Sequence, residues 1–380
     1  MNSVRTRARI ALSVAAILQA SCSNNQSAVD SGAAGDAGAS DIATDGAPEA
    51  APFDAFSPTD APNDGPATVT DTADETKGSM GPAGNVCPGG SGDASTTGVM
   101  TLASGLDGPS SIAVDSTGVY WTDEYGGTVM SAGLDGGPAA TLASGQDGPN
   151  SLAVYAGQVY WTNGGDGTVA TAPVGGGAAE VLASLQLQPT GIAASGAGVF
   201  WANYDGDSVM SASMADGGAS STVAALQGQP AAVAVDSVNV YWVDEGSGAV
   251  MKAPLTGGLP VPLAMGQGNP NQIAVDSTRV YFTTSEDGGV VLEVPLDGGS
   301  ATTLASASSP QGLAVDTNYV YWTDFGRGAV MKAPVEGGAP VAIALGQPCP
   351  GAIAVDSANV YWTNRGAGHG AGTVNATSKR

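Results

Sequence analysis

Positive charge is scarce in this chain of 380 residues. It holds 11 Lys and Arg against 35 Asp and Glu, so its formal net charge is −24. Such a protein repels polyanions, and we therefore expect neither nucleic acid nor a bare anionic membrane as a partner. The single His, His369, leaves no pair of His residues for catalysis or for a metal site.

Cysteine is scarce too, with three residues, and the first of them follows an export-type signal. Arg5, Arg7 and Arg9 precede the apolar run 10–18, which is too short to span a bilayer. The order resembles a bacterial lipoprotein signal with Cys22 as the lipidated residue, although Gln19 stands where that pattern has Leu. A discarded or free thiol is the alternative for Cys22. We expect an exported protein of the bacterial cell envelope, either an outer-membrane lipoprotein or periplasmic.

Aromatic residues are nearly absent from residues 23–98, which consist mainly of Ala, Gly, Ser, Asp, Pro and Thr. Such a composition buries too little apolar surface to offset the entropy of ordering. The sequence therefore predicts a signal over 1–22, a disordered acidic linker over 23–98 and one folded domain over 99–380. Because export leads to an oxidising compartment, Cys87 and Cys349 are predicted to pair, two free thiols being the alternative.

A tripeptide, Val-Tyr-Trp or a close variant, returns seven times at intervals of 40 or 41 residues. The copies begin at Val119, Val159, Val199, Val240, Val280, Val320 and Val360. A unit of this length cannot bury its own apolar faces, so the copies must pack on one another. Each holds four short strand-like segments separated by Gly, Asp and Asn, as in 312–316, 320–324, 328–333 and 341–345. A Gly-Gly pair such as Gly337-Gly338 predicts a two-residue turn between the third and fourth segments.

Four antiparallel strands per repeat predict an all-β, seven-bladed β-propeller. The seventh copy ends after its third strand, whereas Val99–Ser104 reads like a fourth strand without a blade. We therefore expect this N-terminal strand to close the last blade, three strands plus one. The aromatic residues of the second strands should pack between blades, and they are Trp121, Trp161, Trp201, Trp242, Phe282, Trp322 and Trp362.

The segment Ile112-Ala-Val-Asp115 followed by Val119-Tyr-Trp-Thr-Asp123 resembles the YWTD repeat of low-density-lipoprotein-receptor-like propellers. Those propellers have six blades, so the resemblance concerns the repeat throughout 99–380 and not the assembly. It implies that the residue ending the motif is structural, namely Asp123, Asp244 and Asp324, with Asn163, Asn203 and Asn364 as substitutes and Thr284 as a departure. At the level of the fold, the chain is also similar to seven-bladed bacterial streptogramin lyases. That resemblance implies His and acidic residues around a divalent metal at the channel.

Small or polar residues follow the Pro that opens each predicted first strand, which should line the central channel. These candidate ligand-binding residues of the channel mouth are Ser110, Ser111, Asn150, Ser151, Thr190, Asn271, Gln272 and Gln311. Tyr125, Tyr204 and Phe325 should lie in loops on the same face, where propellers usually bind. An equally open interpretation is that this polar ring only holds ordered water.

Two further candidates are weaker. His369 lies in a Gly-rich loop of the last repeat, where a base or metal ligand would need partners, so an exposed loop residue is the default. The segments Asn203–Asp207 and Asp123–Gly127 carry oxygen ligands suited to Ca²⁺, although Asp and Asn before Gly are also ordinary turn residues.

We expect a non-enzymatic binding or scaffold module that is lipid-anchored and monomeric and has no resident cofactor. It would bind a protein, peptide or saccharide through its channel-mouth face. The alternative is a metal-dependent lyase or glycan-acting enzyme that uses acidic residues at the channel, and the lack of a nucleophile motif weighs against it. A purely architectural surface protein is the third reading.

Overall fold

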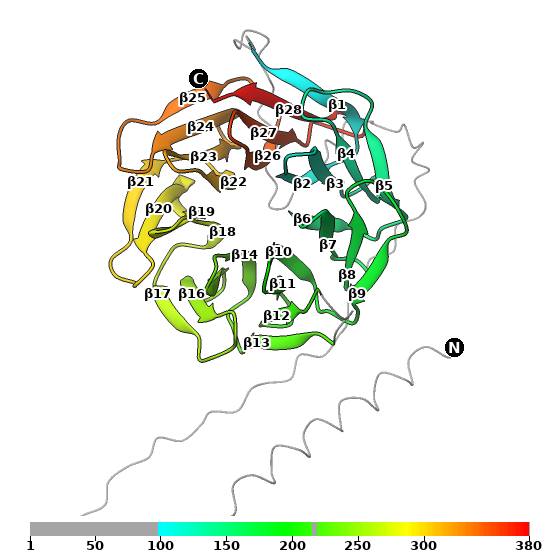
Figure 1. Ribbon diagram of the computed structural model, residues 1–380. Coiled ribbons are helices and arrows are strands. Elements are labelled where there is room, and N and C mark those ends of the chain that lie inside the picture. The colour runs from blue at the N-terminus through cyan, green and yellow to red at the C-terminus, as the bar shows by residue number, and fades with distance from the viewer. Residues whose placement is uncertain (1–97, 215–218, 380) are drawn as a thin grey trace, which may run out of the picture. The chain divides into compact units, whose positions relative to one another are not determined.

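The computed structural model describes residues 98–214 and 219–379. The predicted signal, the linker, Cys22 and Cys87 lie outside these residues. Within them, 28 strands form seven four-stranded sheets arranged around a ring (Figure 1). The all-β, seven-bladed propeller predicted from the repeats is confirmed. We number the blades from the one that contains β2 to the one that contains β26.

Each blade runs from an inner strand at the channel to an outer strand at the rim. The inner strands are β2 (Pro109–Val114), β6 (Pro149–Tyr155), β10 (Pro189–Ser195), β14 (Pro230–Val235), β18 (Pro270–Val275), β22 (Pro310–Val315) and β26 (Pro350–Val355). The second strands are β3 (Val119–Asp123), β7 (Gln158–Asn163), β11 (Gly198–Asn203), β15 (Asn239–Asp244), β19 (Arg279–Thr284), β23 (Tyr319–Asp324) and β27 (Asn359–Asn364). The third strands are β4 (Thr128–Ala132), β8 (Thr168–Pro173), β12 (Ser208–Ala212), β16 (Ala249–Pro254), β20 (Val290–Pro295), β24 (Ala329–Pro334) and β28 (Gly372–Ser378). The outer strands are β5 (Ala140–Ser144), β9 (Glu180–Ala183), β13 (Ser221–Ala225), β17 (Val261–Ala264), β21 (Thr302–Ser306), β25 (Val341–Ala344) and β1 (Met100–Leu106).

The ring is closed by the first strand of the domain. β1 pairs antiparallel with β28, from Met100 opposite Ala376 to Leu106 opposite Gly372, and so completes the seventh blade. This confirms the predicted closure, although the strand extends two residues beyond the predicted segment. β1 covers the outward edge of β28, which would otherwise be free to pair with another chain.

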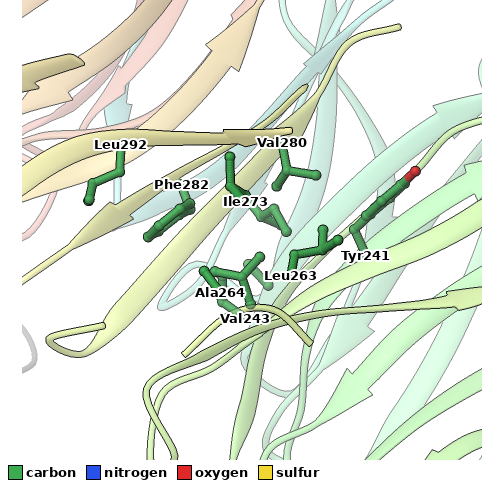
Figure 2. Close-up of a cluster of buried hydrophobic side chains, with 11 residues drawn as sticks. Tyr241, Val243, Leu263, Ala264, Ile273, Val280, Phe282 and Leu292 are labelled. Atoms are coloured by element: carbon green, nitrogen blue, oxygen red, sulfur yellow. The ribbon is translucent and has the colours of Figure 1, made fainter. Parts of the chain in front are cut away.

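The core lies between the blades. Seven clusters of buried side chains each combine an aromatic of one second strand with the aromatic of the next, as Tyr120 with Trp161 and Tyr241 with Phe282. Figure 2 shows the latter cluster, in which Tyr241 and Phe282 lie among aliphatic side chains from both blades. The six Trp of the second strands and Phe282 are 0% exposed. Replacing one of these Trp by Ala should cost about 3–5 kcal/mol of stability.

One predicted turn is larger than expected. The third strand β24 ends at Pro334 and the fourth, β25, begins at Val341, so Gly337-Gly338 does not form a two-residue hairpin. Instead, the Gly337 amide closes a turn on the Pro334 carbonyl, and both Gly have positive φ, 85° and 149°. The Gly pair therefore lies within a longer loop that connects β24 to β25. The only helix within the described residues is the short 3-10 turn η1 (Glu286–Gly288), and no helix there is long and apolar enough to cross a membrane.

Candidate functional site

The two ends of the propeller differ in the loops they carry. At one end, which we call the loop face, the hairpins between second and third strands lie beside the connections from one blade to the next. The Tyr125 amide donates to the Asp107 carbonyl and the Gly165 amide to the Asp147 carbonyl across this junction. The opposite end, the far face, carries the other two turns of each blade. Tyr125, Tyr204 and Phe325 all lie in loop-face hairpins, as expected from strand polarity.

The channel is lined by uncharged strands. The seven inner strands contain no Asp, Glu, Lys, Arg or His, and Ala, Ser, Gly, Val, Ile and Leu dominate them. Their first residue is always a buried Pro, which sets the loop-face mouth of the channel. Without an Asp, Glu, Lys, Arg or His side chain on these strands, the channel wall itself supplies neither a carboxylate–histidine pair nor carboxylate ligands.

All eight predicted channel-mouth residues lie half-buried on inner strands, and half of them join neighbouring blades. The Ser110 hydroxyl donates to the Pro149 and Asn150 carbonyls of the next blade (3.2 and 3.1 Å). The Ser111 hydroxyl accepts a bond from the Leu152 amide (3.1 Å). These two hydroxyls therefore join neighbouring blades through their hydrogen bonds and are not available to a ligand in the channel.

Thr190 and Asn271 behave in the same way. The Thr190 hydroxyl lies 3.4 Å from the Pro230 carbonyl, and the Asn271 amide donates to the Pro310 carbonyl at 3.3 Å. Within the described chain, no protein group hydrogen-bonds the side chains of the remaining four, which are Asn150, Ser151, Gln272 and Gln311. The mouth that is open to a ligand is thus narrower than the sequence predicted, and it comprises inner strands β6, β18 and β22.

The Thr of the second strands is a structural residue that the sequence analysis did not single out. The Thr122 hydroxyl accepts a bond from the Ser111 amide (3.0 Å) and donates to the Asn150 carbonyl of the next blade (3.0 Å). The same inter-blade contact links the Thr162 hydroxyl to the Thr190 carbonyl (2.8 Å) and that of Thr323 to the Gly351 carbonyl. The recurrence of Thr after Tyr-Trp was the available signal.

A Gln in the connections between blades is a second such residue. Gln186 accepts bonds through Oε1 from the Trp201 indole (3.0 Å) and from the Asn203 amide (2.9 Å). Gln146 and Gln347 bind the corresponding Trp and Asn in the second and seventh blades. The Asn substitutes of the motif are therefore structural in these three blades, as the YWTD resemblance implied.

The Asp residues that end the motif are also buried and tied to the preceding connection. Asp123 accepts a bond from the Asp107 amide (3.0 Å), and Asp324 accepts one from the Ser308 amide (3.1 Å). Burial raises the pKa of Asp123 above its usual range. Burial likewise raises the pKa of Asp244 to about 6, against the lowering effect of the Gly228 amide. The raised pKa values of Asp123 and Asp244 therefore reflect burial at the blade junction, where these carboxyl groups have a structural role.

Acids of the far face are occupied by tyrosines. The Tyr241 hydroxyl donates to Asp236 at 2.6 Å, and the same Asp accepts the Val238 and Asn239 amides of its turn. Burial would raise the pKa of Asp236, but these hydrogen bonds lower it overall. Equivalent pairs join Tyr281 to Asp276, Tyr321 to Asp316 and Tyr361 to Asp356. These acids are part of the blade structure and not free for chemistry.

His369 is 90% exposed, and it contacts one acid. Its Nδ1 lies 2.8 Å from a carboxylate oxygen of Asp107, which follows β1. The pair therefore bridges the two ends of the chain across the closing blade. Within the described residues, no group of three or more His, Cys, Asp or Glu is arranged to hold a metal ion.

The two segments considered for Ca²⁺ make turn and junction contacts. Asp207 has a positive φ of 46° and accepts a bond from the Gln229 amide (3.2 Å). Asn203 binds Gln186, and Asp123 binds the Asp107 amide, so both face the blade junction. Asn203 makes its contact through the amide nitrogen, whereas Asp123 and Asp207 accept through one carboxylate oxygen each. The choice between a Ca²⁺ site and ordinary turn residues stays open.

A pocket of about 350 Å³ opens on the loop face between the second and third blades. It is lined by the hairpin 164–167, by Gln186, Leu187 and Gln188 of the connection, and by Asp205. With its amide oriented as a donor, Gln188 binds both carboxylate oxygens of Asp205 (3.0 and 3.2 Å). The sequence analysis did not predict this pocket.

Cys349 is 1% exposed and disulfide-bonded. It directly precedes β26, at the start of the blade that β1 closes. Cys87, its predicted partner, lies outside the described residues, so the identity of the pair stays a prediction.

Comparisons with known proteins place the fold and not a family. No family model matches the chain, and no curated protein matches it. Among solved structures, a streptogramin B lyase has a TM-score of 0.64 at 14% identity, over 74% of this chain and 97% of that one. The WD40 propeller of Doa1 has a TM-score of 0.61 at 15% identity, over 74% and 96%. A nidogen–laminin complex matches half of this chain at 23% identity with a TM-score of 0.45. The first two similarities show a β-propeller, a fold that a lyase and a WD40 domain share.

Proposed function

We propose that this protein is a non-enzymatic binding or scaffold module whose loop face holds a protein, peptide or saccharide. The observation that carries the proposal is the contrast between the channel wall and the loops. The inner strands carry no charged residue, whereas aromatic and acidic residues such as Tyr125, Tyr204, Asp166 and Asp205 gather in the loop-face hairpins. Converging loops on a rigid ring are where a propeller presents a recognition surface.

A metal-dependent lyase or glycan-acting enzyme is the competing function. It is favoured by the fold of the streptogramin B lyase, but that likeness is at 14% identity and concerns the fold alone. It would require acids and His at the channel. The buried Asp123 and Asp324 bind backbone amides at blade junctions. The single His, His369, lies in the loop between β27 and β28, against Asp107. These contacts favour binding over catalysis.

We further propose that the protein is exported and held by a lipid on Cys22, as a monomer of the bacterial cell envelope. The support for this is the order of Arg, apolar and small residues before Cys22. Labelled palmitate should enter the wild-type chain and not a Cys22→Ser variant. Equal labelling of both would contradict lipidation while leaving the binding proposal intact.

The binding proposal is tested with glycan and peptide arrays probed by the purified mature protein. We expect specific ligands whose binding weakens in a variant with Asn150→Ala, Gln272→Ala and Gln311→Ala. These half-buried side chains lie on inner strands and have no hydrogen-bond partner in the described part of the chain. A matched control is Asp297→Asn, an exposed change on the far face. Substrate turnover by the protein, or bound metal that a chelator removes together with an activity, would overturn the non-enzymatic assignment.

A further inference from the structure

Two exposed leucines occupy a backbone position that other blades give to glycine. In the connections that leave the second and third blades, Leu185 has a φ of 60° and Leu226 one of 58°. The same position is Gly105, Gly145, Gly266 and Gly346 elsewhere, with φ between 65° and 75°. A left-handed conformation is strained for Leu and free for Gly. These leucines therefore cost stability, and they bury nothing in return, since they are 91% and 95% exposed.

The apolar character extends along the same loops. Leu187, 60% exposed, stands where the two preceding connections have Asp107 and Asp147. Met265, 61% exposed, begins the next connection after that of Leu226. Apolar side chains thus follow three consecutive connections on the loop face. Exposed apolar groups that continue over neighbouring elements mark interaction surfaces.

Acidic groups complete this surface. The pocket between the second and third blades begins beside Leu187 and carries Asp166 and Asp205, both exposed, and no basic residue lines it. Asp207 and Glu245 follow in the adjoining hairpins, whereas the loop-face Arg residues, Arg327 and Arg365, belong to the sixth and seventh blades. A partner that covers Leu185, Leu187 and Leu226 therefore meets negative charge beside the apolar contacts.

We propose that this surface is a docking site for a basic, partly apolar peptide segment of a partner protein. Leu185, Leu187 and Leu226 would bind its apolar side chains, and Asp166 and Asp205 would pair with a Lys or Arg that enters the pocket. The proposal rests on the binding function proposed above and assigns that function to the surface formed by Leu185, Leu187, Leu226 and the adjoining pocket. Charge complementarity selects this occupant, because a second copy would bring the same acidic loop face and a polyanion would be repelled.

The backbone strain at Leu185 and Leu226 allows binding to be separated from folding, because replacing these leucines by Gly should not lower stability but should weaken binding. In Leu185→Gly/Leu226→Gly, a left-handed Gly relieves the strain, so the midpoint of thermal unfolding should stay equal or rise. Binding should fall, because the apolar contacts are gone. A loss of binding in this variant is therefore not a folding defect. The matched control is Leu259→Ser, which removes a leucine that is 87% exposed on the far face.

A phage library of random dodecapeptides is selected on the immobilised mature protein, and the selected peptides are synthesised for fluorescence anisotropy. We expect peptides with Lys or Arg next to Leu, Phe or Trp. Their affinity should fall about tenfold or more in the Leu185→Gly/Leu226→Gly variant and in Asp166→Asn/Asp205→Asn. Leu259→Ser should bind as the wild type does.

Other outcomes overturn the docking site in distinguishable ways. Some peptides could bind the Leu185→Gly/Leu226→Gly variant as well as they bind Leu259→Ser, and fail to bind Asn150→Ala/Gln272→Ala/Gln311→Ala. That result would place binding at the channel mouth and leave the proposed function standing. Acidic or uncharged selected peptides would overturn the partner chemistry. An empty selection would overturn peptide docking alone, because the proposed function also includes saccharides. Peptides indifferent to every loop-face variant would overturn both proposals.

Discussion

A single Gln between blades determines whether a buried indole has a partner. Gln146, Gln186, Gln227 and Gln347 each accept a bond from a Trp Nε1. Leu106 and Ala307 replace this Gln before the first and sixth blades. There the buried Nε1 atoms of Trp121 and Trp322 have no hydrogen-bond partner among residues 98–214 and 219–379. The blades therefore share one backbone fold but differ in whether the buried Trp indole has a hydrogen-bond acceptor.

Replacing Gln186 by Met, which has a similar length, should lower the free energy of unfolding by about 1–3 kcal/mol. The change leaves the buried Trp201 indole without its partner and removes one of the two partners of the Asn203 amide, and unpaired buried donors carry this cost. Urea unfolding measures it. Gln267→Met is the matched control, because Phe282 and Thr284 take the places of Trp and Asn there and Gln267 binds only the Met265 carbonyl. Equal losses in both variants would refute the role of the indole contact.

Asp244 gives a pH-dependent prediction. Its pKa of about 6 in the folded protein exceeds the unfolded value of about 3.9. The folded state thus holds a proton that the unfolded state has lost, and the free energy of unfolding falls as pH rises from about 4 to about 6. Asp244→Asn should remove this loss and gain on the order of 2 kcal/mol at pH 7, with no gain at pH 4. Urea unfolding at both pH values checks it, and a gain independent of pH would contradict the assignment.

At the scale of elements, the second strands were the best predicted. Aromatic and β-branched residues in a 40-residue period indicated buried strands and four strands per blade, and they predicted the missing outer strand. The polar ring was predicted less well. Ser110 and Thr190 lie on inner strands, and their hydroxyls bond to the next blade's carbonyls. Only the three-dimensional register brings those carbonyls within reach, so sequence spacing alone could not separate structural from available groups.

Strand β1 should be indispensable although it is the outermost strand of its blade. Deleting residues 100–106 exposes the edge of β28 and removes Leu102 and Leu106 from the cluster around Trp121. We expect loss of the single cooperative thermal transition, followed by circular dichroism, and aggregation seen by light scattering. Deleting 60–66 removes the same length from the predicted linker and serves as the control. A β1 deletion that melts like the wild type would refute closure by this strand.

At the scale of the whole molecule, a ring of seven blades needs its two chain ends joined. The structure joins them by β1 on β28, by His369 with Asp107, and by the hydrogen bond from the Thr377 hydroxyl to the Gly98 carbonyl. Cys349, which directly precedes β26 in the same blade, is disulfide-bonded. The sequence predicted the closing strand and a disulfide-bonded Cys349 but not the exposed contact between His369 and Asp107, which depends on the path of a Gly-rich loop.

The predicted Cys87–Cys349 pair can be tested by a mutant cycle. Cys87→Ala should lower the free energy of unfolding by about 2–4 kcal/mol, because the cross-link restricts the unfolded chain. Adding Cys349→Ala should cost little more than the loss of one buried thiol. Peptide mapping without reductant should show the linked pair in the wild type. Additive losses, or two unlinked peptides, would contradict the pairing.

The direction of β1 determines at which end of the propeller the described part of the chain begins. Met100 pairs with Ala376 near the far-face end of β28, and the strand then runs to the loop face, where Leu106 meets Gly372. Gly98 therefore lies at the end of the propeller opposite Leu185, Leu187 and Leu226, where its carbonyl accepts a hydrogen bond from the Thr377 hydroxyl. A ligand that covers these leucines on the loop face would leave the start of β1 uncovered.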